Sequence, residues 1–435
     1  MKIADAKEVL SKFSPLSSLG KVKNVAGIMI EVTGIQAKVG DICTIYGADD
    51  HLITSEVVGF KDENVLLMSY GDMKGISPGA FVQTTGTQLR VPVGNFLIGR
   101  TVDATGYPMD GKGDFAEISE FYDVEGKPAN PMERVRISER MTYGIKPIDG
   151  MLTIGKGQRM GIFAGSGVGK STLMGMIARN VKADVNVIAL VGERGREVVE
   201  FIERDLGPEG QKRSVLVVAT SDQPALMRFK CAQTATAIAE YFQRQGKDVL
   251  LMMDSLTRFS MAQREIGLAN GEPPVSRGYP PSVYAEMPKL LERAGNGAKG
   301  SITGLYTVLV DGDDFNEPIT DTARSILDGH IMLSRKLGHK NHYPAIDVLQ
   351  SISRCMSQIA SGEHKKMAGK LKTVMATYNE AEDLINIGAY KRGSNASIDY
   401  AIEKIDAVNQ FLCQDVYEKV AFEESVDRLK ALFEN

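Results

Sequence analysis

The sequence predicts an α/β protein built from three units, and three observations predict this. Short β-type runs separated by glycine-rich turns occupy residues 22 to about 85, as in a small antiparallel barrel. From about 150 to 335, continuous apolar runs alternate with helical patterns, which is typical of a parallel sheet covered on both faces. After about 360 only helical spacing remains. We expect domains at 1–85, 86–360 and 361–435.

The first unit contains five β-type runs, at 28–32, 52–54, 57–60, 65–68 and 81–83. Glycines separate the runs at the spacing expected of short antiparallel strands. Before the first run, residues 4–13 form a candidate amphipathic helix with Val9, Leu10 and Phe13 on its apolar side. This segment is either a partner-binding helix or a plain packing helix.

The second unit opens with a glycine-rich loop between a strand and a helix. Residues 164–171 read Ala-Gly-Ser-Gly-Val-Gly-Lys-Ser, after the apolar run 160–163 and at the start of a helical pattern. Such a loop turns backbone N–H groups around a phosphate at the positive end of a helix. The predicted nucleotide contacts are Gly165, Ser166, Gly167, Val168, Gly169, Lys170, Ser171 and Thr172.

This loop predicts a nucleoside triphosphate with Mg²⁺. We expect Lys170 to reach the β- and γ-phosphates and the Ser171 hydroxyl to bind Mg²⁺. The first position of the usual G-x-x-x-x-G-K-[ST] pattern is Ala164 instead of glycine, which is the smallest departure available.

Further along, acidic residues follow two of the predicted strands. The strands are expected at 187–191, 215–218, 249–253 and 306–310, with helices at 197–205 and 225–245. Ligands of an open parallel sheet bind beyond the carboxyl ends of its strands, so residues placed there are candidates for chemistry.

Asp254 follows the strand 249–253 and is placed to hold Mg²⁺, although an aspartate there also caps helices and turns. Glu193 follows the strand 187–191 and is placed to align a water against the γ-phosphorus. The alternative is that Glu193 pairs with Arg194 or Arg196 in a surface turn.

The third unit keeps helical spacing at Leu371, Val374, Met375 and Tyr378, and again from Ile398 to Ile405, and is predicted to be a small helical domain.

The composition of the chain argues against two classes of protein, those that bind nucleic acid over a large surface and those that span a membrane. A net charge of −4 gives no support to a dominant nucleic-acid surface, and no apolar stretch approaches the length of a membrane span.

Several long motifs resemble a known family. The segments GIFAGSGVGKSTLMGMIAR, VIALVGERGREVVEFIERDLG and DSLTRFSMAQREIGLANGEPPVSRGYPPSVYAEMPKLLERAG are similar to the RecA-like P-loop NTPase core of rotary ATPase-related enzymes. The segments GSITGLYTVLVDGDDFNEPITDTARSILDGHIMLSRKL and HYPAIDVLQSISR resemble the type III protein-export ATPases in particular. The resemblance runs from about residue 20 to the C-terminus. It implies a Mg-ATP-hydrolysing enzyme of the flagellum or of the virulence injectisome, and we prefer the flagellum.

The resemblance also implies individual roles. Glu193 matches the carboxylate that activates the attacking water, and Arg194 follows it as in the family motif. Tyr343 matches the aromatic residue that packs against adenine, the alternative being a core tyrosine beside Pro344. The second half of the adenine pocket stays open, because residues 411–414 lead to Asp415 where related synthase subunits carry an aromatic residue.

Arg354 matches the arginine finger that the family inserts into the nucleotide site of a neighbouring subunit. The alternative is a surface ion pair, and Arg335 and Arg293 are other candidates for action in trans. A shared site implies a ring, which in the family is a homohexamer.

The family also implies partners: a stator-like regulator at the N-terminus, a central-stalk protein, an export gate, substrates and their chaperones. It implies a cytoplasmic enzyme peripheral to the inner face of the cell membrane. The proline-rich loop 271–281 faces the central hole in relatives or serves as a rigid connection.

Three other functions fit the sequence less well. A rotary synthase subunit is disfavoured because residues 384–393 fit the export branch and lack the acidic lever segment, and because one chain carries both Glu193 and Arg354. A Rho-like nucleic-acid translocase would need aromatic residues over a basic groove in the barrel, and residues 22–85 show no such clustering. A silent ring scaffold would be expected to lack Lys170 or Glu193.

Overall fold

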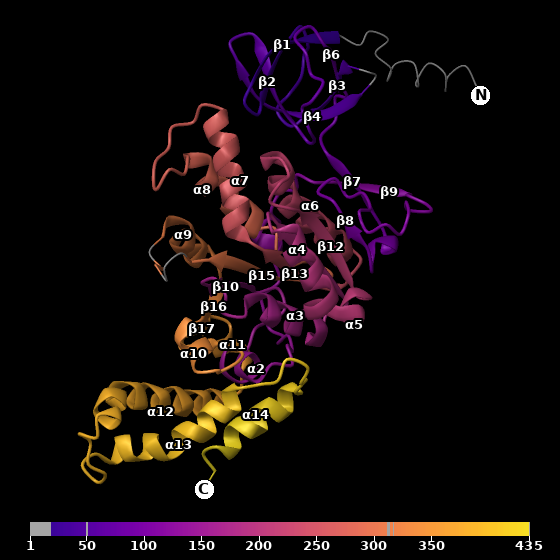
Figure 1. The fold of residues 1–435 in the computed structure, drawn as a ribbon. Helices are drawn as coiled ribbons and strands as arrows, with labels where there is room; N and C mark the ends of the chain where they lie inside the picture. Colours follow the sequence, from indigo (N-terminus) through magenta and orange to yellow (C-terminus); the bar gives the residue numbers. More distant parts are fainter. Residues whose placement is uncertain (1–18, 49–50, 311–313, 316, 435) are drawn as a thin grey trace.

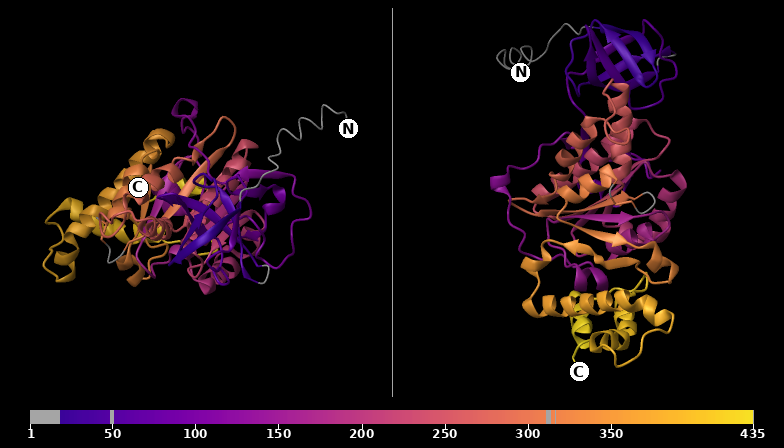
Figure 2. Two further views of the ribbon diagram at one scale, coloured as in Figure 1. Left: turned by 90° about the horizontal axis from the view of Figure 1, so that it is seen from above. Right: turned by 90° about the vertical axis from the view of Figure 1, so that its left-hand side faces the viewer.

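The computed structural model describes residues 19–48, 51–310, 314–315 and 317–434. Three units follow one another along the long axis of the molecule (Figures 1 and 2), with the barrel at one end, the sheet in the middle and the helical domain at the other end. The predicted fold class is therefore confirmed. The candidate helix at 4–13 lies outside the described residues.

The N-terminal barrel is closed and has the strand order β1-β2-β5-β4-β3-β6. Its strands are β1 (Leu19–Ala26), β2 (Met29–Thr33), β3 (Ile42–Tyr46), β4 (Leu52–Lys61), β5 (Asn64–Ser69) and β6 (Phe81–Thr84). Alternate residues point inward, so Ile30, Val32, Ile45 and Leu67 are fully buried inside. The sequence predicted four of these strands, divided β4 into two and missed β1 and β3.

The central sheet has the order β17-β16-β10-β15-β13-β11-β12-β8, with β14 pairing on β15. Its strands are β8 (Thr101–Val102), β10 (Arg159–Ala164), β11 (Val185–Val191), β12 (Ser214–Ala219), β13 (Asp248–Asp254), β14 (Gly295–Asn296), β15 (Ser301–Leu309), β16 (Gly329–Leu333) and β17 (Ile346–Ser353). All pairings are parallel except those of β14 and β17. A separate ribbon joins β7 (Arg90–Val93) to β9 (Glu120–Asp123).

Helices cover both faces of this sheet (Figure 1). The helices of this unit are α2 (Lys146–Met151), α3 (Lys170–Asn180), α4 (Gly195–Glu200), α5 (Gly207–Gln211), α6 (Ala225–Arg244), α7 (Leu256–Ala269), α8 (Pro281–Leu291), α9 (Pro318–Ile326), α10 (Arg335–His339) and α11 (Met356–Ile359). Along β11, Val187 and Ala189 belong to one buried cluster while Ile188 and Leu190 belong to another, as a strand covered on both sides requires.

One predicted helix is more irregular than expected. The pattern at 197–205 predicted a single helix, but α4 passes at Phe201 into a π-helical turn, η4 (Phe201–Leu206), before α5 begins. This turn packs closely on α3, where a Cβ added at Gly175 would overlap the carbonyl oxygen of Asp205.

The C-terminal unit consists of α12 (Gly362–Asn386), α13 (Ala396–Leu412) and α14 (Phe422–Ala431). Leu371, Val408 and Leu429 join the cluster that covers one face of the sheet, so these helices extend the core of the central unit. Among the described residues, no helix combines the length and the apolar character that a membrane span needs.

The barrel is fastened to the central unit by a buried cation. Lys230 of α6 has 1% of its side chain exposed and forms ion pairs with Glu56 of the barrel at 2.8 Å and with Glu125 at 2.6 Å. A buried charge is tolerated only when it is paired in this way, so the contact fixes where the barrel meets the sheet.

Candidate active site

The glycine-rich loop joins β10 to α3 as predicted. Gly167 and Gly169 have φ angles of 78° and 87°, a left-handed region that glycine enters without strain. Gly169 is the N-cap of α3, so the first backbone N–H groups of the helix have no intrahelical partner and face the loop. Ala164 is buried at the end of β10 and accepts a hydrogen bond from Val310 N–H, so its methyl group lies in the sheet and leaves the loop free.

Three predicted side chains meet beyond the carboxyl ends of the strands. Lys170 Nζ donates to Asp254 Oδ1 and lies 3.8 Å from Glu193 Oε1. Lys170 begins α3 after the loop that follows β10, Asp254 ends β13 and Glu193 follows β11, and these three strands belong to one parallel sheet. The structure therefore brings the phosphate-binding lysine, the metal-binding candidate and the proposed base together.

Asp254 is only 4% exposed, and its Oδ1 also accepts from Thr307 Oγ1 of β15 at 2.7 Å. Asp254 thus ends a buried strand and does not cap α7, because the cap of that helix is Ser255. Ser171 at the start of α3 and Asp254 are both oxygen ligands, the type that Mg²⁺ prefers. The residues present fit the predicted cation.

The environment of Glu193 suits a proton acceptor. Burial and the nearby Asp254 carboxylate raise the pKa of Glu193 to about 7, against the opposing charges of Lys170 and Arg258. Arg194 pairs instead with Glu197 at 3.4 Å, and Arg196 pairs with Glu200 at 2.7 Å. The alternative in which Glu193 serves a surface ion pair with these arginines is therefore not what the structure shows.

Sequence reasoning missed Arg258. This residue lies in the first turn of α7, and its charge lowers the pKa of Glu193. Its buried Nε has no hydrogen-bond partner, and its side chain packs beside Gly192. The signal was present: a cation four residues after Asp254, on the helix that follows the strand, is carried back toward the same strand end.

Tyr343 lies against the phosphate loop. A Cβ placed at Gly169 would be 3.6 Å from Tyr343 Cε1, and the side chain is 41% exposed, so this is not a core tyrosine. Its carbonyl accepts from Gln414 N–H at 2.9 Å. The Gln414 side-chain amide in turn accepts from the Lys146 N–H and donates to the Gly144 carbonyl, so the segment after α13 joins Tyr343 to the start of α2.

Arg354 lies far from the phosphate loop of its own chain. β10 runs toward the loop, β16 is parallel to β10, and β17 is antiparallel to β16, so Arg354 follows β17 at the edge where β10 begins. Six residues of strand, about 20 Å, separate the two edges. Among the described residues, the exposed Arg354 guanidinium has no hydrogen bond or ion pair.

Of the other two arginines, Arg293 is buried and holds Glu240 through two hydrogen bonds of 2.8 and 2.9 Å, which removes it as a candidate in trans. Arg335 begins α10.

Comparison with known families divides the chain in three. The ATP synthase alpha/beta family beta-barrel domain matches residues 22–86, and the nucleotide-binding domain of the same family matches residues 144–353. The T3SS EscN ATPase C-terminal domain matches residues 360–431.

Similar proteins match over nearly the whole chain. The flagellum-specific ATP synthase of Bacillus subtilis is 58% identical, over 96% of this chain and 95% of the relative. The type 3 secretion system ATPase of Xanthomonas euvesicatoria is 51% identical, over 95% and 93%. The assembled ATPase EscN of the enteropathogenic E. coli type III secretion system superposes with a TM-score of 0.90 at 44% identity, over 95% of this chain and 99% of that chain. A structure of EscN with its central stalk EscO matches with a TM-score of 0.88 at 43% identity, over 95% and 99%.

Proposed function

We propose that the protein works as a ring that hydrolyses Mg-ATP for flagellar protein export. The chain belongs to the ATP synthase alpha/beta family and, within it, to the ATPases of flagellar and type III secretion systems. One observation carries the proposal. Lys170, Asp254 and Glu193 converge at one edge of the sheet, while the exposed Arg354 lies at the opposite edge.

The residues have separate roles in this proposal. The N–H groups of residues 165–169 and the start of α3 bind the phosphates, and Lys170 leaves its carboxylate partners to reach the β- and γ-phosphates. Ser171 and Asp254 hold Mg²⁺, which supplies charge neutralisation at the phosphate oxygens. Tyr343 stacks on the adenine ring.

Glu193 accepts a hydrogen bond from the attacking water and aligns it with the γ-phosphorus. Arg194 follows the base in the family motif and is assigned to the same site. Arg258 faces Glu193 with an unsatisfied Nε, and we assign it to the γ-phosphate. A cation there balances the negative charge that Glu193, Asp254 and the triphosphate bring together.

Arg354 completes the site of a neighbouring copy. An arginine that stabilises the transferring phosphoryl group contributes about 10³–10⁵ in rate. Since Arg354 lies about 20 Å from its own loop, a second copy must receive it, and a closed ring supplies one to every site. The likeness to assembled EscN supports a homohexamer.

The remaining roles follow from the relatives. We propose that ATP turnover drives release or unfolding of export substrates and their delivery to an export gate, with a stator-like regulator, chaperones and a central-stalk protein as further partners. The EscN complex with its central stalk EscO supports the last of these. The proline-rich loop 271–281 links α7 to α8 and would line the central hole. We place the enzyme in the cytoplasm, peripheral to the cell membrane.

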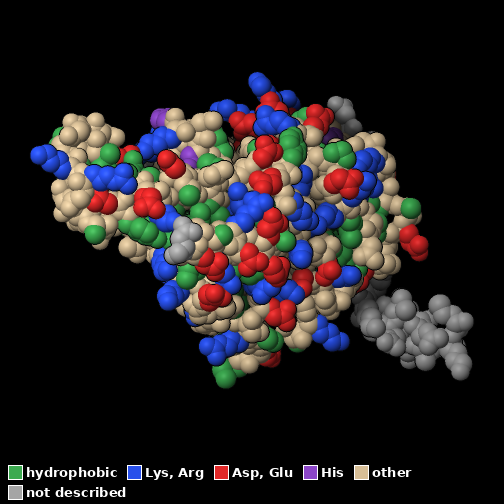
Figure 3. All heavy atoms as spheres, turned by 90° about the horizontal axis from the view of Figure 1, so that it is seen from below, with side chains coloured by type: hydrophobic (Ala, Val, Ile, Leu, Met, Phe, Trp, Pro, Cys, Tyr) green, Lys and Arg blue, Asp and Glu red, His purple; other side chains and the backbone are tan. Residues whose placement is uncertain are grey.

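Several observations favour these choices over the alternatives. The C-terminal match to EscN supports an export ATPase over a rotary synthase subunit. The 58% identity to the flagellar relative supports flagellar over injectisome service. We propose no nucleic-acid partner, because acidic and basic side chains are interspersed on the C-terminal face (Figure 3) and the net charge is −4. We also propose domains at 1–85, 86–360 and 361–435.

Mixed rings test this function. Glu193→Gln and Arg354→Ala should each bind ATP, and each should lose at least about 100-fold in kcat, the scale of losing one stabilising group. Mixed together they should recover ATPase activity, because an Arg354→Ala copy with an intact Glu193 receives the arginine of a Glu193→Gln copy. Absence of recovery in rings shown to contain both variants would refute a shared site.

A further inference from the structure

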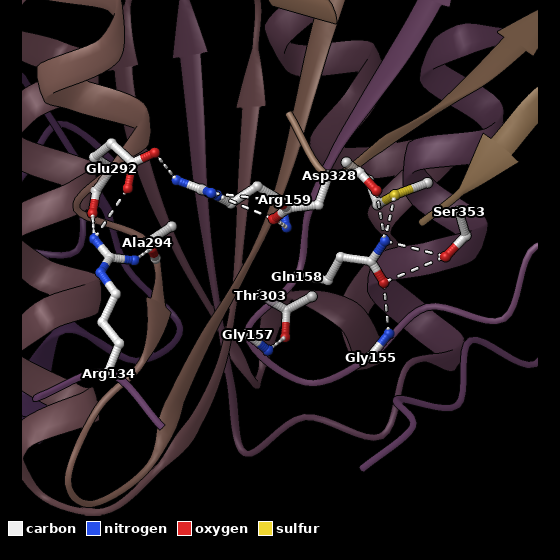
Figure 4. Close-up of polar contacts among 11 residues, drawn as sticks. Arg134, Gly155, Gly157, Gln158, Arg159, Glu292, Ala294, Thr303, Asp328 and Ser353 are labelled. Carbon is white, nitrogen blue, oxygen red and sulfur yellow. Dashed lines mark hydrogen bonds and ion pairs between the residues drawn. The ribbon is translucent and has the colours of Figure 1, made fainter. Parts of the chain in front are cut away.

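The residue before the arginine finger is held by a buried side-chain amide (Figure 4). Ser353 Oγ accepts from Gln158 Nε2 at 3.1 Å and donates to the Thr153 carbonyl at 3.0 Å. Gln158 is fully buried, and its Oε1 accepts from Gly155 N–H at 2.8 Å. Both ends of the amide are therefore bonded, which fixes its orientation.

The same amide reaches the group that holds the backbone of Arg354. Gln158 Nε2 lies 3.1 Å from the Asp328 carbonyl oxygen, and that oxygen also accepts from Arg354 N–H at 3.0 Å. One NH₂ group thus bonds the Ser353 hydroxyl and the carbonyl on which Arg354 is anchored. We call Gln158, Asp328 and Ser353 the Gln158 clamp.

A chain of ion pairs holds Asp328 of the clamp in place. Both Arg159 Nε, at 3.1 Å, and Arg159 Nη2, at 3.3 Å, donate to the Asp328 carboxylate. Arg159 Nη1 pairs with Glu292, which pairs in turn with Arg134 Nη2 at 3.2 Å (Figure 4). Arg134 also donates to the Ala294 carbonyl at 3.1 Å. The turn after α8 is thereby connected to Asp328, whose carbonyl accepts from the Arg354 N–H just after β17.

The end of β17 packs closely against β16. Ser353 pairs with Gly329, and a Cβ added at Gly329 would overlap the carbonyl oxygen of Ile352. The backbone up to Ser353 is therefore packed and hydrogen-bonded, whereas the Arg354 side chain is exposed. A fixed backbone thus carries the Arg354 side chain and directs it away from its own chain.

We propose that the Gln158 clamp positions Arg354 for the nucleotide site of the neighbouring subunit, with Gln158 as its central positioning residue; this rests on the proposed role of Arg354 in trans. A misplacement of about 1 Å can cost about 100-fold in rate, so a finger needs such support. Gln158 directly precedes β10, the strand that leads to the phosphate loop of the same chain. The proposal nevertheless assigns Gln158 to Arg354 and therefore to the site of the neighbouring subunit.

The test uses Gln158→Ala in the full chain. We expect rings to form and ATP affinity to change less than about threefold, while kcat falls about 10- to 100-fold. The matched control is Asn186→Ala, because the buried Asn186 amide also donates to a carbonyl, Ala178 at 2.9 Å, and to a serine hydroxyl, Ser214 at 3.3 Å, away from Arg354. Its kcat should remain within about threefold of wild type despite a similar loss of stability.

Two mixtures separate positioning of the finger from damage to the phosphate loop. Gln158→Ala mixed with Glu193→Gln should recover activity, because the first variant keeps an intact site and receives an intact arginine. Gln158→Ala mixed with Arg354→Ala should not recover, because neither copy supplies a well-placed arginine. The opposite pattern would show that Gln158 serves its own phosphate loop, and would overturn the inference.

Failure of the proposed function gives a different result. If Arg354→Ala and Glu193→Gln do not complement each other, the finger in trans is wrong and the clamp falls with it. If they do, but Gln158→Ala keeps wild-type kcat, only the clamp is wrong. Should Gln158→Ala not fold, Ser353→Ala removes a single hydroxyl at the same place, and its mixtures are judged by the same two outcomes.

Discussion

At the scale of single residues, the environment of Glu193 suits the role of base that we propose for this carboxylate. An exposed glutamate titrates near 4.3 and is too weak a base to accept a proton near neutral pH. Burial and the neighbouring Asp254 raise the Glu193 pKa to about 7, within the range where a general base is most effective. Burial and the Asp254 carboxylate also make the ionised form of Glu193 destabilising to the folded protein.

The raised pKa predicts an acid limit to activity. Below pH 7 Glu193 becomes protonated and can no longer take a proton from the attacking water, so kcat/KM for Mg-ATP should fall about tenfold per pH unit below an apparent pKa near 7. The measurement is steady-state ATPase activity from pH 5.5 to 8.5, on rings shown to stay assembled. A profile that stays flat down to pH 5.5 would remove Glu193 as the base.

The stability of the ligand-free protein supplies a control for the same pKa. Because the folded pKa lies above the unfolded value, the folded state binds the proton more tightly, and stability falls as pH rises between about 4.5 and 7. Glu193→Gln removes this penalty, so it should be more stable than wild type by about 3 kcal/mol at pH 8 and by less than about 1 kcal/mol at pH 5. Thermal unfolding at both values measures the difference.

Tyr343 predicts a change in affinity. Its ring lies beside Gly169, so Tyr343→Ala should weaken ATP binding about tenfold, since stacking of an aromatic ring on a base contributes about 1–3 kcal/mol. Tyr343→Phe should bind like wild type, because the stacking surface remains. Nucleotide titrations measure both, and a Tyr343→Ala variant with unchanged affinity would place adenine elsewhere.

At the scale of elements, the position of the phosphate loop depends on how closely α3 packs. Gly175→Ala should destabilise the protein by about 1–3 kcal/mol, because the new methyl group would overlap the Asp205 carbonyl in the π-helical turn. Gly369→Ala in α12 is the matched control, since no atom lies within 4 Å of its added Cβ. It should stabilise by up to about 1 kcal/mol. Chemical denaturation of the two variants should therefore move in opposite directions.

The same turn shows where the sequence was informative and where it was not. Buried strands such as β11 and β13 were predicted because both their faces are apolar, and α6 because its spacing is regular over its whole length. The π-helical turn was missed because it is set by packing on α3. β16 and β17 were missed because neither has the long continuous apolar run of β11: β16 is only five residues long, and in β17 buried residues alternate with more exposed ones.

The candidate site was predicted in proportion to how local its signals were. The loop at 165–172 and the acids after β11 and β13 each lie directly after a strand, so parallel topology alone brings them together. Arg258 lies a helical turn further on and was missed. Gln158 was missed as well, because nothing near it in sequence indicates Ser353 or Asp328, which only the pairing of β10, β16 and β17 brings beside it.

At the scale of the whole molecule, the strand directions of the central sheet separate the two halves of each proposed site. The proposed base and the phosphate loop lie at one edge of the sheet and Arg354 at the other, so in the proposed mechanism a single chain holds an incomplete site at each edge. The barrel is joined to α6 through the ion pair of Lys230, and the helical domain shares the buried cluster on one face of the sheet. Both end units are therefore packed against the central unit that lies between the two edges.

This separation predicts that specific ATPase activity rises with protein concentration as rings assemble. Excess Glu193→Gln protein, itself inactive, should raise the activity of dilute wild-type protein, because it supplies arginines and drives assembly. Excess of the double variant Glu193→Gln/Arg354→Ala drives assembly equally but supplies no arginine and carries no base, so each wild-type copy should gain far less. Activity is measured per mole of wild-type protein, with sedimentation under the same conditions. Wild-type activity that stays constant down to concentrations where only monomers sediment would show that one chain suffices.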